Sequence, residues 1–270
     1  MKDIKIIFID VDGTLADDNN IISEENKAAL KKIEENGVIP VLCSGRTRKI
    51  VDSRYKEIGM SKTNVFICSN GAEIFDTETE KVLYSKYISN YIVKLIFYIC
   101  QKRNIAIKLR TTNDIYINKL WDTCDKKYNI IENISQIDNK KIVRIKCKID
   151  DDKVLKLLLL LLRAIRQIKI TTKEYENSSI FIGIETKYTN KGNAIRKYLK
   201  KIKISKKNAC AIGNDLNDIQ MFREVKYKVA MENSIDELKK KANFITLSNN
   251  DNGVAAFINK KIFCEEQTWI

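Results

Sequence analysis

Short apolar runs that alternate with amphipathic helical segments constrain the fold of this chain most strongly. Within the first 76 residues, strand-like runs at 4–9, 38–43 and 65–68 are separated by two segments with helical signals. In the first helical segment, Ser23 is a predicted N-cap residue and Gly37 a predicted C-terminal stop. The order strand–helix–strand–helix–strand predicts a parallel sheet with crossover helices.

The pattern changes in the middle of the chain and returns from about residue 190, where a Lys-rich helix and a strand at 209–212 are expected. We therefore predict an α/β fold: a Rossmann-like parallel-sheet core formed by residues 1–82 and 185–270, with residues 83–184 inserted as an α+β domain. A chain of 31.3 kDa is long enough for two such units. The strands expected in the insert are 106–109, 115–117, 142–149 and 180–184, and the helices are 92–102 and 153–167.

The inserted segment is strongly basic. Residues 84–184 carry 20 basic and 10 acidic side chains, in a chain with a net charge of +14. A cationic domain favours anionic partners. The alternative is an unselected, solvated surface, because Lys, Asn and Ile are abundant along the whole chain. Four cations form i, i+2 pairs on or beside predicted strands, which places each pair on one face: Lys108, Arg110, Arg144 and Lys146.

The chain contains no histidine, which excludes Ser-His-Asp triads, Cys-His pairs and His-ligated zinc. Its seven cysteines include no CxxC pair, so buried free thiols in a reducing cytosol are expected rather than a zinc or redox motif. The apolar stretch at 6–9 is too short for a signal peptide or anchor. The six leucines at 157–162 fall short of the roughly 20 apolar residues of a membrane span. We expect a cytoplasmic protein with no membrane partner.

Two carboxylates follow the first predicted strand. Asp10 and Asp12 stand at i and i+2 of an extended segment, so both side chains point to the same side. The carboxyl ends of parallel strands form the crevice where open α/β sheets bind ligands. Gly13 permits a sharp turn, and Thr14 offers a hydroxyl and an N–H to an anion. Such a pair can divide labour, one acid acting as nucleophile or metal ligand and the other as general acid and base. The alternative is an ordinary Asp-Gly surface turn.

Three further segments contain residues that could bind an anion or a metal ion. Ser44 and Gly45 follow the second strand and could hold a phosphate oxygen, although Ser-Gly is also a common turn. Lys191 opens a predicted helix, where the helix dipole disfavours a cation, so a bound anion would explain its position. The segment after the strand at 209–212 collects carboxylate and amide oxygens suited to Mg²⁺ or to a helix cap: Asn214, Asp215, Asn217 and Asp218.

Taken in order, these four segments resemble the motifs of the haloacid dehalogenase superfamily of phosphatases. The resemblance is closest to the Cof-type branch, which has a large α/β cap between the second and third motifs. It covers nearly the whole chain and includes the segments at 68–72, 230–233 and 242–255. The DVDGT segment at 10–14 is quite specific, and the ordered set is highly so. The resemblance implies that the insert is a cap that sets substrate specificity.

The resemblance also implies a role for each matching residue. Asp10 would be the nucleophile that takes the phosphoryl group as an aspartyl-phosphate, and Asp12 would protonate the leaving alcohol and then activate water. The phosphate-binding residues would be Thr14, Ser44, Gly45, Lys191 and Asn217. The Mg²⁺ ligands would come from Asp10, the backbone carbonyl of Asp12, Asn214, Asp215 and Asp218. None of these roles needs histidine, because phosphoryl transfer depends on positioning and charge neutralisation.

The fourth motif departs from the family pattern, because Asn214 stands where an aspartate is usual. The loss of an anionic ligand predicts a higher Mg²⁺ requirement. Glu232 also stands where the family tends to have glycine.

The leading hypothesis is a Mg²⁺-dependent phosphatase acting on small phosphorylated metabolites, with sugar phosphates favoured. One alternative is a phosphomutase of the same superfamily. Another is a catalytically weak protein whose basic insert binds nucleic acid or a different polyanion. The insert has few aromatic residues among its cations and no RNA- or DNA-binding motif, which argues against nucleic acid. The sequence does not indicate an oligomeric state.

Overall fold

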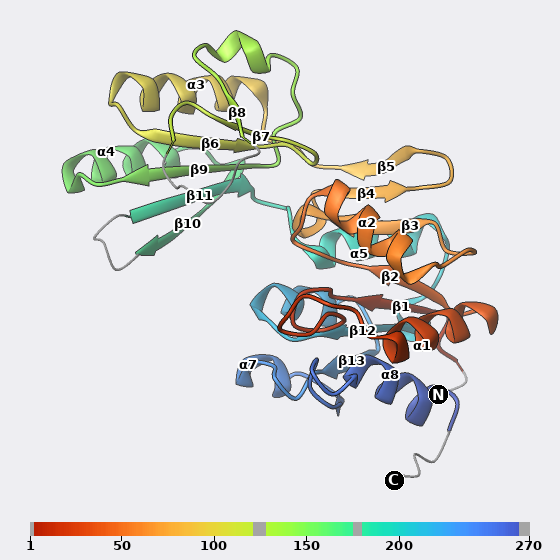
Figure 1. Ribbon diagram of the computed structural model, residues 1–270. Coiled ribbons are helices and arrows are strands. Elements are labelled where there is room, and N and C mark those ends of the chain that lie inside the picture. The colour runs from red at the N-terminus through yellow and green to blue at the C-terminus, as the bar shows by residue number, and fades with distance from the viewer. Residues whose placement is uncertain (1–2, 121–127, 175–179, 265–270) are drawn as a thin grey trace. The chain divides into compact units, whose positions relative to one another are not determined.

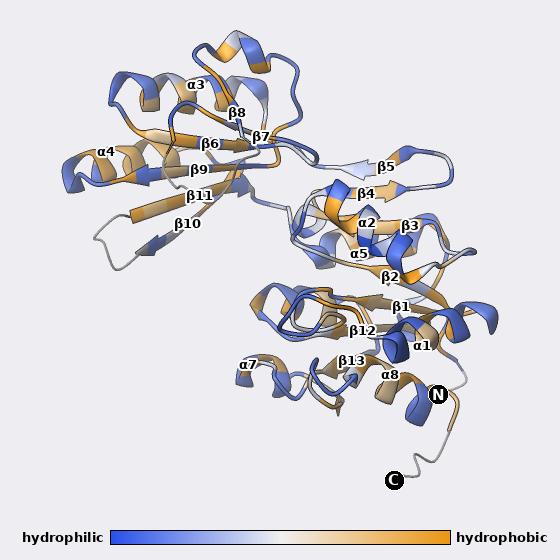
Figure 2. Cartoon of the chain, viewed as in Figure 1, coloured by the Kyte–Doolittle hydropathy of each residue, from blue (hydrophilic) through white to orange (hydrophobic). Residues whose placement is uncertain are grey.

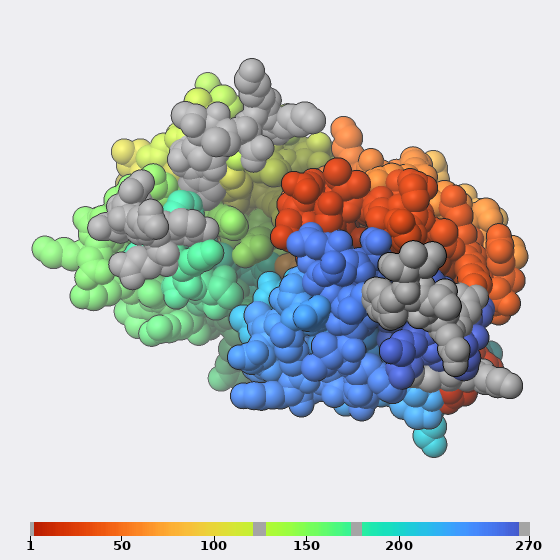
Figure 3. Space-filling view, turned by 60° about the horizontal axis from the view of Figure 1, so that its bottom comes forward, coloured from red at the N-terminus to blue at the C-terminus, as the bar shows by residue number. Residues whose placement is uncertain are grey.

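The chain folds into two compact units in a computed structural model, which describes residues 3–120, 128–174 and 180–264. The core unit comprises Met1–Ser85 and Asn190–Ile270, and the insert unit comprises Lys86–Thr189 (Figure 1). The boundaries predicted from the sequence lie a few residues earlier, at 82/83 and 184/185. Figure 3 shows the N-terminal (red) and C-terminal (blue) segments of the core unit side by side, and together they form this one unit.

The core unit contains eight of the described strands and six of the described α-helices. The strands are β1 (Ile6–Ile9), β2 (Ile39–Leu42), β3 (Val65–Cys68), β4 (Glu73–Asp76), β5 (Lys81–Ser85), β12 (Ala209–Gly213), β13 (Tyr227–Ala230) and β14 (Phe244–Ile245). The helices are α1 (Glu24–Glu35), α2 (Arg48–Ile58), α5 (Lys191–Lys201), α6 (Ile219–Phe222), α7 (Asp236–Lys239) and α8 (Gly253–Phe257).

A parallel sheet with the strand order β14-β13-β12-β1-β2 forms the centre of the core unit. All four residues of β1 are buried, and they alternate between two hydrophobic clusters. Ile7 and Ile9 pack on the side that includes α1 and α8, and Ile6 and Phe8 pack on the side that includes α5. Figure 2 shows β1 and β12 in hydrophobic colours along their length. A strand covered on both faces has to be apolar throughout, which explains the uninterrupted run at its start.

The third predicted strand, β3, forms as expected but pairs mainly with an antiparallel neighbour rather than within the parallel sheet. β3 meets β2 through one parallel bridge, Cys43↔Ile67, and pairs antiparallel with β4, which pairs antiparallel with β5. The cause is the turn at Ser69–Gly71, which reverses the chain directly after β3. A tight reversal allows only antiparallel pairing, because a parallel partner needs a long crossover.

The insert unit is a six-stranded sheet with two described α-helices packed on one face. Its strand order is β10-β11-β9-β6-β7-β8. Its strands are β6 (Ala106–Arg110), β7 (Ile115–Ile117), β8 (Asn129–Ile130), β9 (Arg144–Ile149), β10 (Ile168–Glu174) and β11 (Ile180–Thr186), and its helices are α3 (Asn90–Lys102) and α4 (Asp152–Arg163). The prediction of a helix to residue 167 was wrong at its end, because α4 stops at Arg163 and β10 begins five residues later, at Ile168.

Two further expectations concern cysteines and membranes. Five described cysteines are buried thiols, at positions 43, 68, 100, 147 and 210. Cys264 is exposed, so the expectation of burial was wrong there, and Cys124 lies outside the described residues. Among the described helices, none has the length and apolar character that crossing a membrane would require.

Candidate active site

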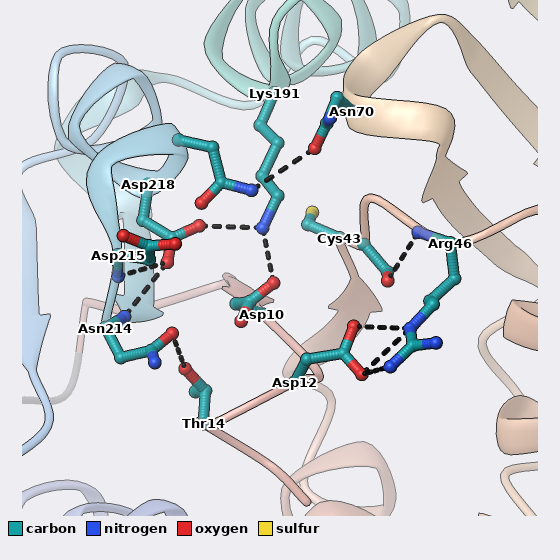
Figure 4. A network of polar contacts seen from close by, with 12 residues as sticks. Asp10, Asp12, Thr14, Cys43, Arg46, Asn70, Lys191, Asn214, Asp215 and Asp218 are labelled. Atoms are coloured by element: carbon teal, nitrogen blue, oxygen red, sulfur yellow. Dashed lines mark hydrogen bonds and ion pairs between the residues drawn. The ribbon is translucent and has the colours of Figure 1, made fainter. Parts of the chain in front are cut away.

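Three of the predicted site segments meet because their strands are neighbours in the sheet. Asp10 follows β1, Ser44 lies two residues after β2, and Asn214 follows β12. Since β1 lies between β12 and β2 and all three are parallel, their carboxyl ends form one edge. Figure 4 shows the resulting polar cluster. An edge of this kind, at the carboxyl ends of parallel strands, is where open α/β sheets bind ligands.

The Lys191 ammonium lies between two carboxylates at the centre of this cluster. Its Nζ donates one hydrogen bond to Asp10 Oδ1 and a second, 2.7 Å long, to Asp218 Oδ1 (Figure 4). The side chains of Lys191 and Asp218 are fully buried, and that of Asp10 is 7% exposed. These carboxylates account for a lysine at the first position of α5, where the helix dipole alone disfavours a cation.

The pKa values of both Asp10 and Lys191 are raised above their ordinary values. Burial, followed by repulsion from Asp218, raises the pKa of Asp10 to about 7, although Lys191 opposes this shift. Burial by itself lowers the pKa of Lys191, but attraction to Asp10 and Asp218 outweighs burial and leaves that pKa above its ordinary value. The lysine is therefore a fixed positive charge beside a buried carboxylate, as a site for an incoming phosphoryl group requires.

Both oxygens of Asp218 already accept hydrogen bonds. Oδ1 faces Lys191, and Oδ2 accepts from the backbone N–H groups of Asn214 and Asp215 at 2.9 and 3.0 Å. Asp218 therefore fixes both the catalytic lysine candidate and the loop after β12. Asp215 is exposed, and its Oδ1 accepts from the N–H of Leu216 at 2.7 Å.

The carboxylate of Asp12 pairs with an arginine. Arg46 Nε lies 3.1 Å from both carboxylate oxygens of Asp12, and its Nη2 lies 2.9 Å from Oδ1 (Figure 4). The Asp12 side chain is 39% exposed, so the second acid is accessible to solvent whereas Asp10 is not. No role for Arg46 was predicted. Its position next to Ser44 and Gly45 was the available signal, since an arginine suits planar carboxylates and phosphates.

Thr14 and Asn214 form a hydrogen-bonded pair on the β12 side of the site. The Thr14 hydroxyl donates to Asn214 Oδ1 at 3.1 Å, and Thr14 is completely buried. The Asn214 amide lies over Gly13, where a Cβ would come within 2.4 Å of its nitrogen. Gly13 also has a φ of +74°. The glycine is therefore required both by the left-handed backbone and by the close approach of Asn214.

On the β2 side, the predicted phosphate-binding residues meet a residue that the sequence analysis assigned no role. Ser44 is buried, and its hydroxyl accepts from the N–H of Arg46 at 3.0 Å. Asn217 Nδ2 donates to Asn70 Oδ1 at 3.2 Å, and the same Asn70 oxygen would lie 2.9 Å from a Cβ on Gly45. Asn70 itself has a φ of +55°. Asparagine tolerates this left-handed conformation, which the neighbouring Ser69 shares with a φ of +50°.

The oxygen atoms of the cluster fit a Mg²⁺ ion that is also held by other ligands. Among the described residues, no three acidic, cysteine or histidine side chains are placed to hold a metal ion by themselves. The available donors are the Asp10 and Asp215 carboxylates, the Asn214 amide oxygen and the backbone carbonyl of Asp12. Mg²⁺ is commonly bound through one or two carboxylates together with waters and substrate phosphate. This donor set has that composition.

Gly71 lets the β3–β4 turn pack against the start of the helix that carries Lys191. Its φ is +86°, and a Cβ would lie 2.3 Å from the Asn190 carbonyl oxygen. Gly37 has a similar φ of +80° but has nothing within 4 Å of the added Cβ. We expect Gly71→Ala to lower the free energy of unfolding by roughly 2–4 kcal/mol. Gly37→Ala, which adds only backbone strain, should cost about 1–2 kcal/mol.

Urea denaturation of the two variants measures the difference. Because the Gly71 clash is with the backbone directly before Lys191, Gly71→Ala should also reduce turnover, whereas Gly37→Ala should not. Equal losses of stability in the two variants would show that the turn relaxes freely away from α5.

Comparison with known proteins agrees with this geometry. The model of the haloacid dehalogenase-like hydrolases matches residues 7–258. The chain is 31% identical over 257 residues to the 5-amino-6-(5-phospho-D-ribitylamino)uracil phosphatase YcsE of Bacillus subtilis, with 95% of each chain covered. It is 26% identical to the phosphoglycolate phosphatase of Staphylothermus marinus, over 95% of this chain and 97% of that protein. A crystal structure of a haloacid dehalogenase-like hydrolase from Bacteroides thetaiotaomicron shares the fold with a TM-score of 0.80, 24% identity, and coverage of 95% of this chain and 99% of that chain.

The fold and the site define an α/β hydrolytic enzyme with carboxylates at the carboxyl edge of a parallel sheet. The chain belongs to the haloacid dehalogenase-like hydrolases, as its motifs predicted, and the family match spans both units. Within that superfamily it is a phosphatase, a hydrolase of phosphoric monoesters.

Proposed function

We propose that the protein is a Mg²⁺-dependent phosphatase that hydrolyses phosphate monoesters of small metabolites, sugar phosphates above all, through an aspartyl-phosphate. The observation that carries the proposal is the buried Asp10 carboxylate in contact with the Lys191 ammonium, two residues from the accessible Asp12. The sugar-phosphate preference is supported by the Bacillus relative, whose named substrate is a phosphorylated ribityl compound.

In this mechanism a carboxylate oxygen of Asp10 attacks the phosphorus, and the ester P–O bond breaks as the new O–P bond forms. Asp12 donates a proton to the leaving alcohol. Asp12 then takes a proton from the water that attacks the aspartyl-phosphate, and the P–O bond to Asp10 breaks to release inorganic phosphate. Lys191 neutralises the transferring phosphoryl oxygens, and Thr14 and Ser44 offer hydroxyl groups to them. Each step depends on positioned charge rather than on a histidine base.

The proposed Mg²⁺ would be held by Asp10, the Asp12 backbone carbonyl and the loop after β12, and would neutralise phosphoryl charge. In that loop Asp215 is the better candidate for the anionic ligand, because it is exposed and the oxygens of Asp218 are already occupied. Asp218 would then act on the metal only through the loop that it fixes. The insert unit, with residues 83–184 as its predicted extent, is proposed to be the cap that selects the substrate.

Phosphate release from a panel of phosphorylated metabolites, at a series of Mg²⁺ concentrations, tests this function. The panel contains hexose and pentose phosphates, 5-amino-6-(5-phospho-D-ribitylamino)uracil and phosphoglycolate. We expect Mg²⁺-dependent release that is greatest for sugar or ribityl phosphates. Transfer of the phosphoryl group to a second sugar, without free phosphate, would favour the phosphomutase alternative. The absence of both phosphate release and transfer to a second sugar, from folded protein at millimolar Mg²⁺, would contradict both functions.

Asn214 sets a specific expectation for metal affinity. Its neutral amide stands where a carboxylate would strengthen cation binding, and it accepts a hydrogen bond from Thr14. We expect Asn214→Asp to lower the Mg²⁺ concentration at half-maximal activity by about tenfold, the equivalent of about 1.4 kcal/mol. The Thr14 hydroxyl can donate to the new carboxylate as it does to the amide. Wild-type activity that already saturates at micromolar Mg²⁺ would contradict a weakened metal site.

A further inference from the structure

On the described strands β6, β9, β10 and β11, seven cations and one acid lie on the face of the insert sheet that α3 and α4 leave uncovered. The other face packs against the helices through residues such as Ile107, Ile145 and Ile182. Cα partners in neighbouring antiparallel strands point to the same side, so the register assigns the remaining positions to the uncovered face. Among the described residues of β6, β9, β10 and β11, those positions include Lys108, Arg110, Arg144, Lys146, Lys148, Lys169 and Lys173, with Glu185 as the acid.

The densest part of this face is a block of four cations on two adjacent strands. Lys108 of β6 lies directly opposite Lys146 of β9, and Arg110 lies directly opposite Arg144. Like charges in directly opposed positions destabilise a sheet. All four residues are half-buried, so solvent screens their repulsion less than it would on an open surface. Without a compensating anion, this arrangement costs stability.

Described side chains of the insert unit contact Arg144 and Lys108 and offset part of the positive charge, but none of them pairs with Lys146. Arg144 Nε lies 3.3 Å from Glu185 Oε1, and Lys108 Nζ donates to the Tyr128 hydroxyl at 2.7 Å. Lys146 has no hydrogen bond or ion pair with any side chain in the described part of the chain. Burial lowers the pKa of Lys146, and the surrounding cations lower it further, Arg144 foremost. The block therefore contains an uncompensated ammonium group among other cations.

A cavity continues this face beyond the block. The next opposed pair along the same two strands is Ala106 with Lys148, and both residues line a cavity of about 330 Å³. Lys119 and Leu120 line it as well. Two acids, Asp150 and Asp151, also line it. A cavity of this size suits a small molecule rather than an extended polymer.

We propose that the block formed by Lys108, Arg110, Arg144 and Lys146 is a binding site for a multiply charged anionic group, a phosphate or carboxylate cluster, of a small molecule. The anion would lie against Lys146 and relieve the repulsion across β6 and β9. The group could belong to the substrate or to a free anion, since both present the same charge to the site. One described aromatic ring, that of Tyr128, has its centroid 4.4 Å from Lys108 Nζ, whereas a single-stranded nucleic acid is bound by several rings on which successive bases stack.

Competitive labelling of lysines tests the site directly. The intact protein is treated with an amine-reactive ester with and without inorganic pyrophosphate, and modification is measured by peptide mass spectrometry. Pyrophosphate at about ten times its dissociation constant should slow labelling of Lys146 about tenfold. Lys156, which is exposed on α4 and pairs with Asp152, is the control and should be unaffected. Because labelling needs no turnover, its result is independent of the proposed phosphatase mechanism.

Thermal unfolding separates a binding role from a structural one. Lys146→Met should raise the unfolding temperature of the free protein, because it removes a repelled charge, and should abolish the additional stabilisation by pyrophosphate. Lys156→Met should change neither. A fall in unfolding temperature for Lys146→Met, or equal labelling of Lys146 with and without pyrophosphate, would overturn the proposal. Protection by an oligonucleotide but not by pyrophosphate would overturn it as well.

Kinetics then identifies the source of the anion, and this arm alone rests on the proposed function. If the anion is part of the substrate, Lys146→Met should raise KM about tenfold for monoesters with a second anionic group, such as phosphoglycolate, and leave KM for uncharged-alcohol esters unchanged. If the site takes a free anion, pyrophosphate protection should persist while KM is unchanged for every ester. Either pattern supports the site.

Discussion

Asp10→Asn is expected to abolish phosphate release, with a loss of at least about 10³-fold in kcat/KM for every substrate of the wild-type protein. An amide has nearly the shape of the carboxylate but cannot attack phosphorus to form the acyl phosphate. Acid-quenched wild-type protein should yield a phosphorylated peptide containing Asp10, and the variant should yield none. The measurement is phosphate release under saturating Mg²⁺, together with peptide mapping of the quenched protein.

Loss of folding would not explain this result, because the Asp10 charge is itself unfavourable in the folded state. Burial and Asp218 raise the pKa of Asp10 on folding. A carboxyl group whose pKa is raised in the folded state stabilises the protein at low pH, and that contribution is lost as the pH rises through the folded-state value. At pH 8 the ionised Asp10 therefore costs stability, and Asn should leave the free energy of unfolding unchanged or higher.

Asp152→Asn provides the matched control, because Asp152 is an exposed acid at the start of α4. It should retain wild-type turnover and stability. Retention of more than a tenth of the activity by Asp10→Asn would mean that another residue receives the phosphoryl group. Asp12 would then be the next candidate, since its carboxylate is accessible and only two residues away.

The parts of this site that the sequence predicted are those set by single segments. A short apolar run such as Ile6–Ile9 favours a strand covered on both faces, and the polar residue that follows such a strand is expected at the sheet edge. Lys191 was informative for a similar local reason, because a cation at the start of a helix is unfavourable unless an anion is near. Its anions proved to include two carboxylates of the protein itself.

The parts that the sequence did not predict depend on which distant groups share a hydrogen bond. Asp218 was expected among the metal ligands, but its two oxygens are used by Lys191 and by the loop after β12. The pairing of Arg46 with Asp12 joins two motifs 34 positions apart. A residue's type shows what it can bind, but the choice among several partners is made by packing, which local sequence does not encode.

Limits of the local sequence signal also explain why strands β4, β5 and β10 were not predicted. β4 and β5 are four and five residues long and only partly buried, so their hydrophobic signal is weak. β10 was not predicted, and the leucine-rich helix before it was extended to residue 167, because periodicity alone cannot locate the end of a helix that lacks a glycine or proline stop. Strand pairing with β11 decided the outcome.

Lys191→Met is expected to destabilise the protein and to remove its activity. The substitution leaves Asp10 and Asp218 buried together without a cation, and breaking a buried ion pair in this way costs about 3–5 kcal/mol. Urea denaturation should show the loss, and phosphate release should fall by at least about 10²-fold, because the positive charge beside the transferring phosphoryl group is gone. Lys156→Met, an exposed lysine on α4, should change neither quantity.

A double variant separates the loss of stability from the loss of activity. In Lys191→Met with Asp218→Asn, one of the two buried charges is also removed, and the asparagine oxygen can still accept from the N–H groups of Asn214 and Asp215. The double variant should recover much of the lost stability, since replacing both partners of a buried pair by neutral groups is often nearly neutral. It should recover no activity. Recovery of turnover together with stability would mean that Lys191 serves the fold alone, and the phosphoryl charge would then have to be neutralised by the metal ion and the hydroxyl groups of Thr14 and Ser44.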